Sequence, residues 1–514
     1  MNQVGDPQSA RLLAEDPNLE RFRLRAFIDQ LQAAGELERR SGLGLGAVAA
    51  ALEGNPKAVL FENLKSTPHP LVGNVIGTRQ RMAMAFGVDH RQMAGEICRR
   101  LDLAPQLVEV TSEQAPVHQV VMTGADIDLI DMPVHLQHAL DGGPFISAGV
   151  DVTHDPETGR PNVGCRRMML RNRDTVHIGM TGDGRRNHAA ALKRCERLPI
   201  AIILGSWPTD SFTGAFCGTG DELALMSSLR AAPLPLVKCV TQDLRVPADA
   251  EWVIEGYLDA ETDSEAPYGE YLGCYGVATA ALPVMHVTAV TRRRDALFPT
   301  VTISGPTLEY TDTTTLLTAV QEAATWRKLA AAVKQPVAVY SPPRASQLEM
   351  RIAIRAQDDK EPRAAMQAAF EVTFLKNIYV VDADIDIFSD AAMTWAMASR
   401  FLPHRDMVVV TDVKLPYKEP SMWGGAKASK VGFDLTRPVG CEGPLDVIPA
   451  PPTYPGARFE SVRKALEHGP KHFQELMAAI GSDDGRDVTM MLDALRKEGV
   501  LRRELEGGRY LLAG

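Results

Sequence analysis

Apolar residues recur with a spacing near 3.6 in residues 18–38. This spacing predicts an amphipathic helix that ends at Gly35, because glycine commonly follows the last helical turn. The apolar face consists of Phe22, Leu24, Phe27, Ile28 and Leu31. The run KAVLFENL, which comes later, is short and apolar and predicts a strand. We therefore expect a layer of helix and strand near the N-terminus.

The pattern changes to closely spaced strands between about residue 115 and residue 305. Runs such as ISAGVDVTHD, VGCRRMMLRN and PIAIILG are short and apolar, and turn signals separate them, of which DPETGRPN is the clearest. Such closely spaced runs predict a sheet with much antiparallel pairing.

The longest helical stretch is residues 313–333, which is rich in alanine and lacks glycine and proline. We predict that this helix links two halves of the protein. Beyond it, QLEMRIAIRA, RAAMQAAFEV and NIYVVDADIDIF follow one another as strand, helix and strand, an order typical of an α/β layer. The fold class predicted from the whole pattern is α+β.

The last segment, residues 458–514, follows a proline-rich stretch, VIPAPPTYPG, that is typical of a linker. Its pattern predicts three short helices and a two-stranded hairpin with a GG turn, an arrangement that resembles a winged helix. It carries ten basic and ten acidic residues, and its third helix includes Asp487, Asp493 and Glu498. This balance opposes contacts with phosphate groups, so packing or dimer contact is favoured over DNA binding.

Composition and charge narrow the class of protein. The 514 residues are 45% hydrophobic and 23% charged, values typical of a globular protein with a large core. The net charge of −10 disfavours non-specific binding to nucleic acid or to an anionic membrane, so an anionic substrate needs a local basic site. The N-terminus lacks an apolar signal region and no run of 18 apolar residues occurs, so we expect a cytoplasmic protein.

The remaining motifs exclude several familiar sites. The seven cysteines are scattered without a CxxC pair, which indicates buried reduced thiols and neither a disulfide framework nor a zinc ribbon. The sequence contains no GxGxxG after a strand, GxxxxGK[ST], HExxH or GxSxG. A Rossmann dinucleotide site, a P-loop, a zincin site and a hydrolase elbow are therefore unsupported.

Four polar groups fall in the strand-rich region. They are Asn162 with Arg166 and Arg167, then His188, then Glu222, and finally the two acids Glu265 and Glu270 of the segment EAPYGEYLGCYG. An amide, an imidazole and a carboxylate together suit a divalent ion such as Mg²⁺ or Mn²⁺. Taken singly each signal is weak, because a lone histidine is more often a satisfied polar group than a ligand and an arginine on a strand is usually solvated. The alternative for Glu265 and Arg167 is a structural ion pair.

The sequence resembles the UbiD family of reversible non-oxidative decarboxylases, which use prenylated FMN. The resemblance runs from about residue 20 to about residue 450 and rests on motifs in the family's order: LIDMPVHLQHALDGGPFISAGVDVTHDPETGRPNVGCRRMML, LVKCVTQDLRVPADAEWVIEGYL, EAPYGEYLGCYG and VVDADIDIF. It implies a flavin-binding split β-barrel, an α/β oligomerisation domain and cytoplasmic decarboxylation.

The resemblance assigns roles one residue at a time. The family's Asn-x4-Arg strand motif matches Asn162 and Arg167. His188 and Glu222 match the histidine and the glutamate that, with the asparagine, hold Mn²⁺ or Mg²⁺ against the flavin phosphate; K⁺ is a further candidate ion. The segment TGDGRRNH around His188 is longer than the family pattern. The catalytic Glu-Arg-Glu network matches Glu265, Arg167 and Glu270.

The chemistry of decarboxylation agrees with these roles. Loss of CO₂ from an sp² carbon needs an electron sink, which the cofactor supplies through a covalent adduct in related enzymes. Arg167 can orient the substrate carboxylate as a bidentate fork. A proton must then replace CO₂; we assign Glu270 as its donor and Glu265 as the ionised partner of Arg167, although the order could be reversed.

The substrate is left open by the sequence. The segment EYTDTTTLL matches the part of relatives that meets substrate, so Thr313 and Leu317 are expected to line the pocket. SKVGFDLTRP is expected to close over the site, with Phe433 and Leu435 as contacts. Small apolar and hydroxyl groups favour a flat aromatic or heteroaromatic acid over a dicarboxylate, with an α,β-unsaturated acid and a CoA ester as open alternatives.

The expected architecture divides into an N-terminal α/β layer, a prenylated-FMN-binding split barrel, a linking helix, a C-terminal α/β oligomerisation domain and a winged-helix-like tail. These correspond to residues 1–114, 115–312, 313–333, 334–448 and 458–514. The expected partners are a small carboxylic acid, a flavin prenyltransferase that supplies the cofactor, and further copies of the chain in a homodimer or higher homo-oligomer. A flavin redox protein and an acid-sensing regulator that binds DNA through the tail are the alternative functions.

Overall fold

The computed structural model describes residues 12–13, 18–216, 220–276, 279–306, 308–413, 415, 419–425, 427–441, 458–504 and 507–513. The described residues form two compact units. The first contains those through 383 together with 387–390 and 402–434, and the second contains 384–386, 391–401 and those from 435 on. The predicted linker at 447–456 lies outside the described residues.

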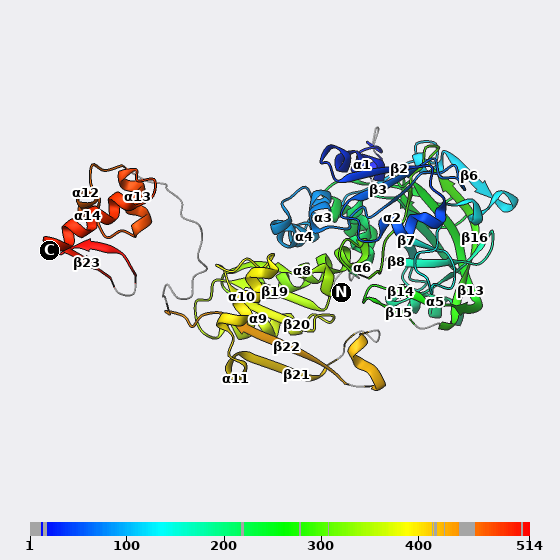
Figure 1. The fold of residues 1–514 in the computed structure, drawn as a ribbon. Helices are drawn as coiled ribbons and strands as arrows, with labels where there is room; N and C mark the ends of the chain where they lie inside the picture. The colour runs from blue at the N-terminus through cyan, green and yellow to red at the C-terminus, as the bar shows by residue number, and fades with distance from the viewer. Residues whose placement is uncertain are drawn as a thin grey trace, which may run out of the picture. The chain divides into compact units, whose positions relative to one another are not determined.

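Six strands of the first unit close into a barrel (Figure 1). Their order is β13-β10-β7-β8-β9-β16, and β16 also pairs with β13, which completes the ring. All pairings around it are antiparallel, so the predicted antiparallel, strand-rich region is confirmed. The strands are β7 (Phe145–His154), β8 (Pro161–Leu170), β9 (Thr175–Ile178), β10 (Leu198–Leu204), β13 (Trp252–Glu265) and β16 (Thr279–Arg292), with β6 (Val120–Thr123) added beside β16.

The strand β10 shows how the sequence builds this barrel. Its residues LPIAIIL are apolar at successive positions, so both faces of the strand must be covered. Ile200 and Ile202 belong to a core cluster that draws side chains from all six strands and therefore fills the barrel. Ala201 and Ile203 belong to a second cluster outside it, together with Leu223 of a covering helix.

Helices and short sheets cover the barrel. The first predicted helix is shorter than expected, because only Leu24–Ala33 is helical (α1) and Leu37–Ser41 forms strand β2, paired with β3. A four-stranded sheet has the order β17-β4-β3-β2, and a second has the order β1-β5-β11-β12. Their strands are β3 (Ala58–Glu62), β4 (Leu71–Gly73), β17 (Phe298–Pro299), β1 (Leu12–Leu13), β5 (Leu107–Glu109), β11 (Leu234–Lys238) and β12 (Arg245–Pro247).

The other helices of this region are α2 (Val48–Leu52), α3 (Arg79–Phe86), α4 (Met93–Leu101), α5 (Gly182–Lys193), α6 (Pro208–Phe216) and α7 (Glu222–Arg230). Short 3₁₀ helices lie at Leu45–Ala47, His90–Gln92, Pro116–His118, Gly124–Asp126, Leu129–Asp131, Pro343–Ala345 and Pro420–Gly425. In the parts of the chain that the structure describes, no helix is both long and apolar enough to cross a membrane.

The helix predicted at 313–333 is α8 (Asp312–Ala332), and an α/β layer follows it, as predicted. A five-stranded sheet has the order β18-β19-β20-β22-β21, in which β19 and β20 are parallel and α9 (Glu361–Phe370) connects them. The strands are β18 (Pro336–Tyr340), β19 (Glu349–Ile354), β20 (Asn377–Asp382), β21 (Met407–Val413) and β22 (Ala428–Leu435). The remaining helices are α10 (Asp390–Arg400) and α11 (Pro403–Asp406).

The C-terminal segment has its own apolar core. Three helices precede a two-stranded hairpin, and Lys471 forms an isolated antiparallel bridge with Tyr510 of that hairpin. The winged-helix assignment remains a prediction. The elements are α12 (Val462–Glu467), α13 (Phe473–Ile480), α14 (Arg486–Lys497), β23 (Leu501–Arg503) and β24 (Tyr510–Leu512).

The six described cysteines are free thiols. Cys98 and Cys239 are buried, as expected, but Cys195 and Cys441 are exposed, so the prediction of buried thiols is wrong for these two. Cys195 follows the end of α5 with a positive φ, a position at a surface turn. Cys217 lies outside the described residues.

Candidate active site

The two predicted acids lie at the end of barrel strand β13 and in the short strand that follows it. Glu265 is its last residue, and the chain then turns through Ala266 and Pro267 into a small hairpin of β14 (Tyr268–Glu270) and β15 (Cys274–Gly276). We call residues 265–276 the acid hairpin. Because β14 and β15 pair only with each other in the described structure, other contacts must hold the hairpin against the barrel.

Arg167 of β8 lies between the two acids. Its Nη2 is 3.0 Å from Glu265 Oε2 and its Nη1 is 3.0 Å from Glu270 Oε1. Both glutamates are 2% exposed, and the guanidinium carbon lies 4.7 Å from the centre of the Tyr268 ring. Burial lowers the pKa of Arg167, but the charges of Glu270 and Glu265 outweigh it and raise that pKa overall. One fixed positive charge therefore faces two carboxyl groups in a nearly dry site.

The carboxylate of Glu265 is only partly engaged. Its Oε2 accepts a hydrogen bond from Arg167, whereas its Oε1 is buried and has no hydrogen-bond partner among the described atoms. Such an atom is costly to bury unless a ligand or water completes its bonding. The site therefore has an unfilled acceptor beside its positive charge.

Asn162 and Glu222 meet near the other end of β8. Asn162 donates from Nδ2 to Glu222 Oε2 at 2.7 Å, and the Val163 backbone N–H donates to the same oxygen at 2.5 Å. Burial raises the pKa of Glu222, and these two hydrogen bonds oppose the rise. The Oδ1 atom of Asn162 is buried without a partner among the described atoms. The pair thus presents an unused amide oxygen and a carboxylate.

A hollow of about 220 Å³ borders this pair. Asp183 and Asn187, four residues apart on α5, line it together with Asn162 and Glu222. Asn187 is buried and its Nδ2 has no partner among the described atoms, while Asp183 forms an ion pair with Arg186. The described residues contain no group of three or more His, Cys, Asp or Glu side chains arranged for a metal ion.

His188 does not line that hollow. It is buried on α5, and its Nε2 is 2.9 Å from the carbonyl oxygen of Asp259 in β13. Successive residues of a helix point about 100° apart, so a residue next to Asn187 faces another direction. Sequence reasoning missed Asp183 and Asn187, although their i, i+4 spacing within GDGRRNH was visible.

Arg166 points away from its neighbour Arg167, because side chains alternate along a strand. Its Nε is 3.2 Å from Asp151 Oδ1, and its Nη1 donates to Thr181 Oγ1 at 3.2 Å. Thr181 is the residue before the first turn of α5. The Arg166 cation therefore lies beside the positive end of that helix, where an anion is favoured.

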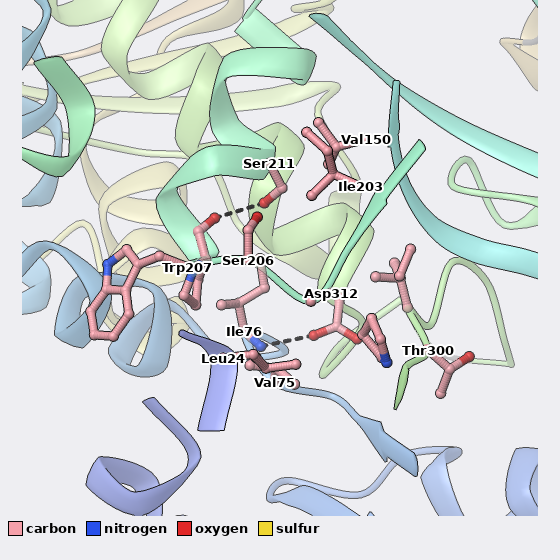
Figure 2. Close-up of a pocket in the computed structure, with 15 residues that line it drawn as sticks. Leu24, Val75, Ile76, Val150, Ile203, Ser206, Trp207, Ser211, Thr300 and Asp312 are labelled. Carbon is pink, nitrogen blue, oxygen red and sulfur yellow. Dashed lines mark hydrogen bonds between the residues drawn. The ribbon is translucent and has the colours of Figure 1, made fainter. Parts of the chain in front are cut away.

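A larger hollow of about 510 Å³ lies beside barrel strands β7 and β10 (Figure 2). Val150 and Ile203 provide apolar walls, and Asp312 reaches it from the start of α8. Asp312 accepts hydrogen bonds from the Ile76 N–H at 2.8 Å and the Thr302 N–H at 3.1 Å, while burial raises its pKa. Part of this space is open to solvent, and the volume that a water-sized molecule can reach is about 80 Å³, below the roughly 300–1,000 Å³ of typical small-molecule pockets.

The residues predicted to line a substrate pocket lie in two places. Thr313 and Leu317 are half-buried in the first turns of α8, next to Asp312 of the larger hollow. Phe433 stacks on Tyr379 of β20, with ring centres 4.8 Å apart, and Leu435 is fully buried at the end of β22. Their contact with substrate remains a prediction.

The chain matches three family models in succession. The N-terminal domain of 3-octaprenyl-4-hydroxybenzoate carboxy-lyase matches residues 28–101, its Rift-related domain matches residues 108–306, and its C-terminal domain matches residues 314–435. The three matches follow the order of the observed elements and include Arg167, Glu265 and Glu270.

Solved structures agree with these matches. The UbiD-class enzyme HmfF from Pelotomaculum thermopropionicum, in complex with FMN, is 30% identical with a TM-score of 0.78, covering 83% of this chain and 97% of that chain. An evolved dimeric form of that enzyme in complex with prFMN is 29% identical, with a TM-score of 0.73 and coverages of 82% and 96%. The Sedimentibacter hydroxybenzoicus vanillic acid decarboxylase in open form is 25% identical, with a TM-score of 0.73 and coverages of 84% and 95%.

These findings define the class of protein. The closed barrel and the α/β layer match enzymes of the carboxy-lyase class along most of the chain. The chain belongs to the UbiD family. The resemblance, the fold class of the barrel and α/β layer, and the enzyme class expected from the sequence are confirmed.

Proposed function

We propose that this chain is a prenylated-FMN-dependent decarboxylase that reversibly removes CO₂ from an aromatic, heteroaromatic or α,β-unsaturated carboxylic acid. The observation that carries the proposal is the position of Arg167, 3.0 Å from both Glu265 and Glu270 in a nearly dry site. The relatives in complex with FMN and prFMN and the vanillic acid decarboxylase support it.

The site fits the cofactor and its ion at the far end of β8. The unbonded Asn162 Oδ1 and the Glu222 carboxylate offer oxygen ligands for Mg²⁺ or Mn²⁺, and Arg166 with the N-terminus of α5 offers positive charge for the flavin phosphate. His188 remains the predicted third ligand: its Nε2 donates to the Asp259 carbonyl oxygen, which leaves the lone pair of Nδ1 for the ion. Asp183, which lines the hollow, is a further candidate. K⁺ remains a candidate from the resemblance alone.

Prenylated FMN, when bound, would supply the electron sink for the electron pair left on carbon as CO₂ departs. The protein's own residues do the rest. The guanidinium of Arg167 pairs with the substrate carboxylate and orients it, as a fixed fork of donors can. The cluster of Phe145, Met169, Tyr268 and Ile303 excludes water beneath it.

Glu265 and Glu270 flank Arg167 at the same distance, so both lie beside the guanidinium that would bind the substrate carboxylate. We assign Glu265 as the ionised partner and Glu270 as the acid. As the bond between carbon and CO₂ breaks, the Glu270 carboxyl proton forms the new C–H bond, and solvent then returns a proton to Glu270.

The remaining parts of the proposal come from the resemblance. The domains are expected at residues 1–114, 115–312, 334–448 and 458–514, with the linking helix at 313–333, and the chain is expected to form a homodimer or higher homo-oligomer. A flavin prenyltransferase would supply the cofactor. The DNA-binding alternative is not favoured, because the tail carries equal numbers of acidic and basic residues.

Co-expression with a flavin prenyltransferase tests the proposal. The absorbance spectrum and mass of the extracted cofactor identify the flavin, and NMR in D₂O with bicarbonate follows exchange at the carbon that carries the carboxylate in a panel of aromatic, heteroaromatic and acrylic acids. We expect prenylated FMN and deuterium incorporation into at least one acid. A protein that binds no flavin, or that exchanges no acid while fully loaded, would overturn the proposal.

A further inference from the structure

The loop before β7 consists of residues 135–142, with the sequence HLQHALDG, and forms several hydrogen bonds with the acid hairpin. The Gly269 N–H donates to Asp141 Oδ1 at 2.9 Å, and the Gly142 N–H donates to the Pro267 carbonyl at 2.9 Å. The Tyr268 hydroxyl donates to Gln137 Oε1 at 2.7 Å. These bonds reach the backbone on either side of Tyr268, whose ring supports Arg167. The loop therefore sets the position of the hairpin that carries Glu270.

His138 stands at the centre of this contact. Its Nδ1 is 3.1 Å from Asp141 Oδ2, and its Nε2 is 3.2 Å from the Ser304 carbonyl oxygen. A carboxylate oxygen and a carbonyl oxygen can only accept hydrogen bonds, so both ring nitrogens must donate. A neutral imidazole carries one N–H, whereas the imidazolium carries two. Both bonds form together only when His138 is protonated.

The surroundings of His138 favour its charged form. Burial lowers its pKa, but the hydrogen bond and charge of Asp141, the Ser304 carbonyl and the charge of Glu53 outweigh burial and raise the pKa overall. The remaining titratable groups that face it are the rings of Tyr268 and Tyr275, which meet it edge-on, and His135, whose own pKa is lowered by burial. The Asp141 side chain has no exposed surface and pairs with no other cation than His138 among the described residues.

The ring of His138 also fits closely over the hairpin. A Cβ built on Gly269 would lie 2.4 Å from His138 Nδ1, so any other residue at 269 would displace the ring. Gly142 is similarly restricted, since its Cβ would lie 1.7 Å from the Cβ of Ala266. The glycines of the loop and the hairpin thus allow the two segments to pack backbone against backbone.

We infer that His138 and Asp141 act as a positioning pair for the proposed decarboxylation: protonated His138 ties Asp141 to the Ser304 carbonyl, and Asp141 in turn holds the Gly269 N–H and so the neighbouring Glu270. This inference rests on the proposed function for its effect on turnover, but not for its effect on the hairpin. Because the pKa of His138 is raised in the folded protein, the bonds are complete at pH values below that pKa and one is lost as the pH rises through it.

Two measurements test the pair without relying on turnover. The His138 ring pKa follows from an NMR titration of the full chain, loaded with cofactor and labelled at histidine, assigned by comparison with H138Q. We expect it above the ordinary value of about 6.5 in the unmodified chain and lower in D141N. Amide hydrogen exchange, corrected for its intrinsic pH dependence, should show faster exchange of the peptide containing Gly269 in H138Q. A His138 pKa at or below the ordinary value, or unchanged exchange in H138Q, would overturn the inference.

The kinetic test uses the acid found active in the exchange panel. In the unmodified enzyme, kcat should fall as the pH rises through the pKa of His138. In H138Q the pH profile of kcat should be flatter on the alkaline side. The kcat of H138Q should be about ten- to a hundredfold lower, with KM changed less, since small displacements of a reacting group have effects of this size. H286Q is the matched control. His286 of barrel strand β16 also pairs with an acid, since its Nε2 lies 3.2 Å from Glu261 Oε2. An alkaline limb shared by H138Q would refute the role in turnover. If no acid is active, the proposed function fails while the NMR and exchange results still decide the pair.

Discussion

Replacing Arg167 by glutamine tests whether one charge holds the two acids of the site together. Arg167 lies 3.0 Å from each carboxylate, and both glutamates are almost fully buried. At an effective dielectric constant of about 20, one such pair gains roughly 5–6 kcal/mol before desolvation is counted. Removing one partner of a buried ion pair costs about 3–5 kcal/mol net. The Arg167 side chain keeps 25% of its surface exposed, so we expect the lower end of that range.

The assay is scanning calorimetry of the full chain at pH 8. Unfolding entropy is about 2.1 cal/mol/K per residue, so a loss of about 3 kcal/mol in a cooperative unit of roughly 400 residues lowers Tm by about 4 °C. We expect this difference between R167Q and the unmodified chain, because the variant leaves two buried carboxyl groups without their cation.

The variant R167K is the matched control. Lysine keeps the charge but offers no planar fork, so it can satisfy one carboxylate well and the other poorly. We expect a Tm between those of the unmodified chain and R167Q. If R167Q had the same Tm as the unmodified chain, the two carboxyl groups would not depend on Arg167, and the electrostatic account of the site would be refuted.

The remaining predictions concern single residues of the same site. E270Q should retain the flavin but lose about 10²–10⁴-fold in proton exchange, measured by NMR; full exchange would remove Glu270 from the reaction. H188A should lower the metal and flavin content of the purified protein, measured by elemental analysis and absorbance; unchanged occupancy would remove His188 as a ligand, and a loss in D183N instead would assign that position to Asp183. G269A should expose the hairpin to proteolysis, because the added Cβ would meet the ring of His138; unchanged cleavage would argue against the close packing described above.

The sequence pattern predicted correctly those helices and strands whose formation depends mainly on neighbouring residues. The helix expected at 313–333 is found at Asp312–Ala332, because an alanine-rich stretch without glycine or proline is helical in most surroundings. The helix expected at 18–38 is only Leu24–Ala33 long. Its start is displaced because Arg23 is extended and bonded to Glu251, 228 residues away, and its end because Leu37–Ser41 pairs with β3. Contacts between residues far apart in the sequence produce no pattern in the local sequence, so they could not be predicted from it.

The same distinction applies to the site. The Glu-Arg-Glu residues could be named from the sequence because family motifs surround them, and the structure places their side chains within hydrogen-bonding distance. The role of His188 as a metal ligand stays a prediction. Asp183 and Asn187 line the hollow beside Asn162, and how α5 packs against the barrel decides which face of the helix does so. The contact of His138 with Ser304 spans 166 residues of sequence, and no spacing rule could have indicated it.

The strand β8 carries both ends of the site, and this has a consequence for how such an enzyme can change. Asn162 and Arg167 are five residues apart on one continuous strand, a separation of about 17 Å at the rise of an antiparallel strand. The backbone sets this distance, and side-chain substitutions leave it unaltered. In the proposed function, the strand therefore fixes the distance between the residues that would hold the cofactor and the residues that would act on the substrate. Substitutions in the surrounding walls would then change the substrate without changing that distance.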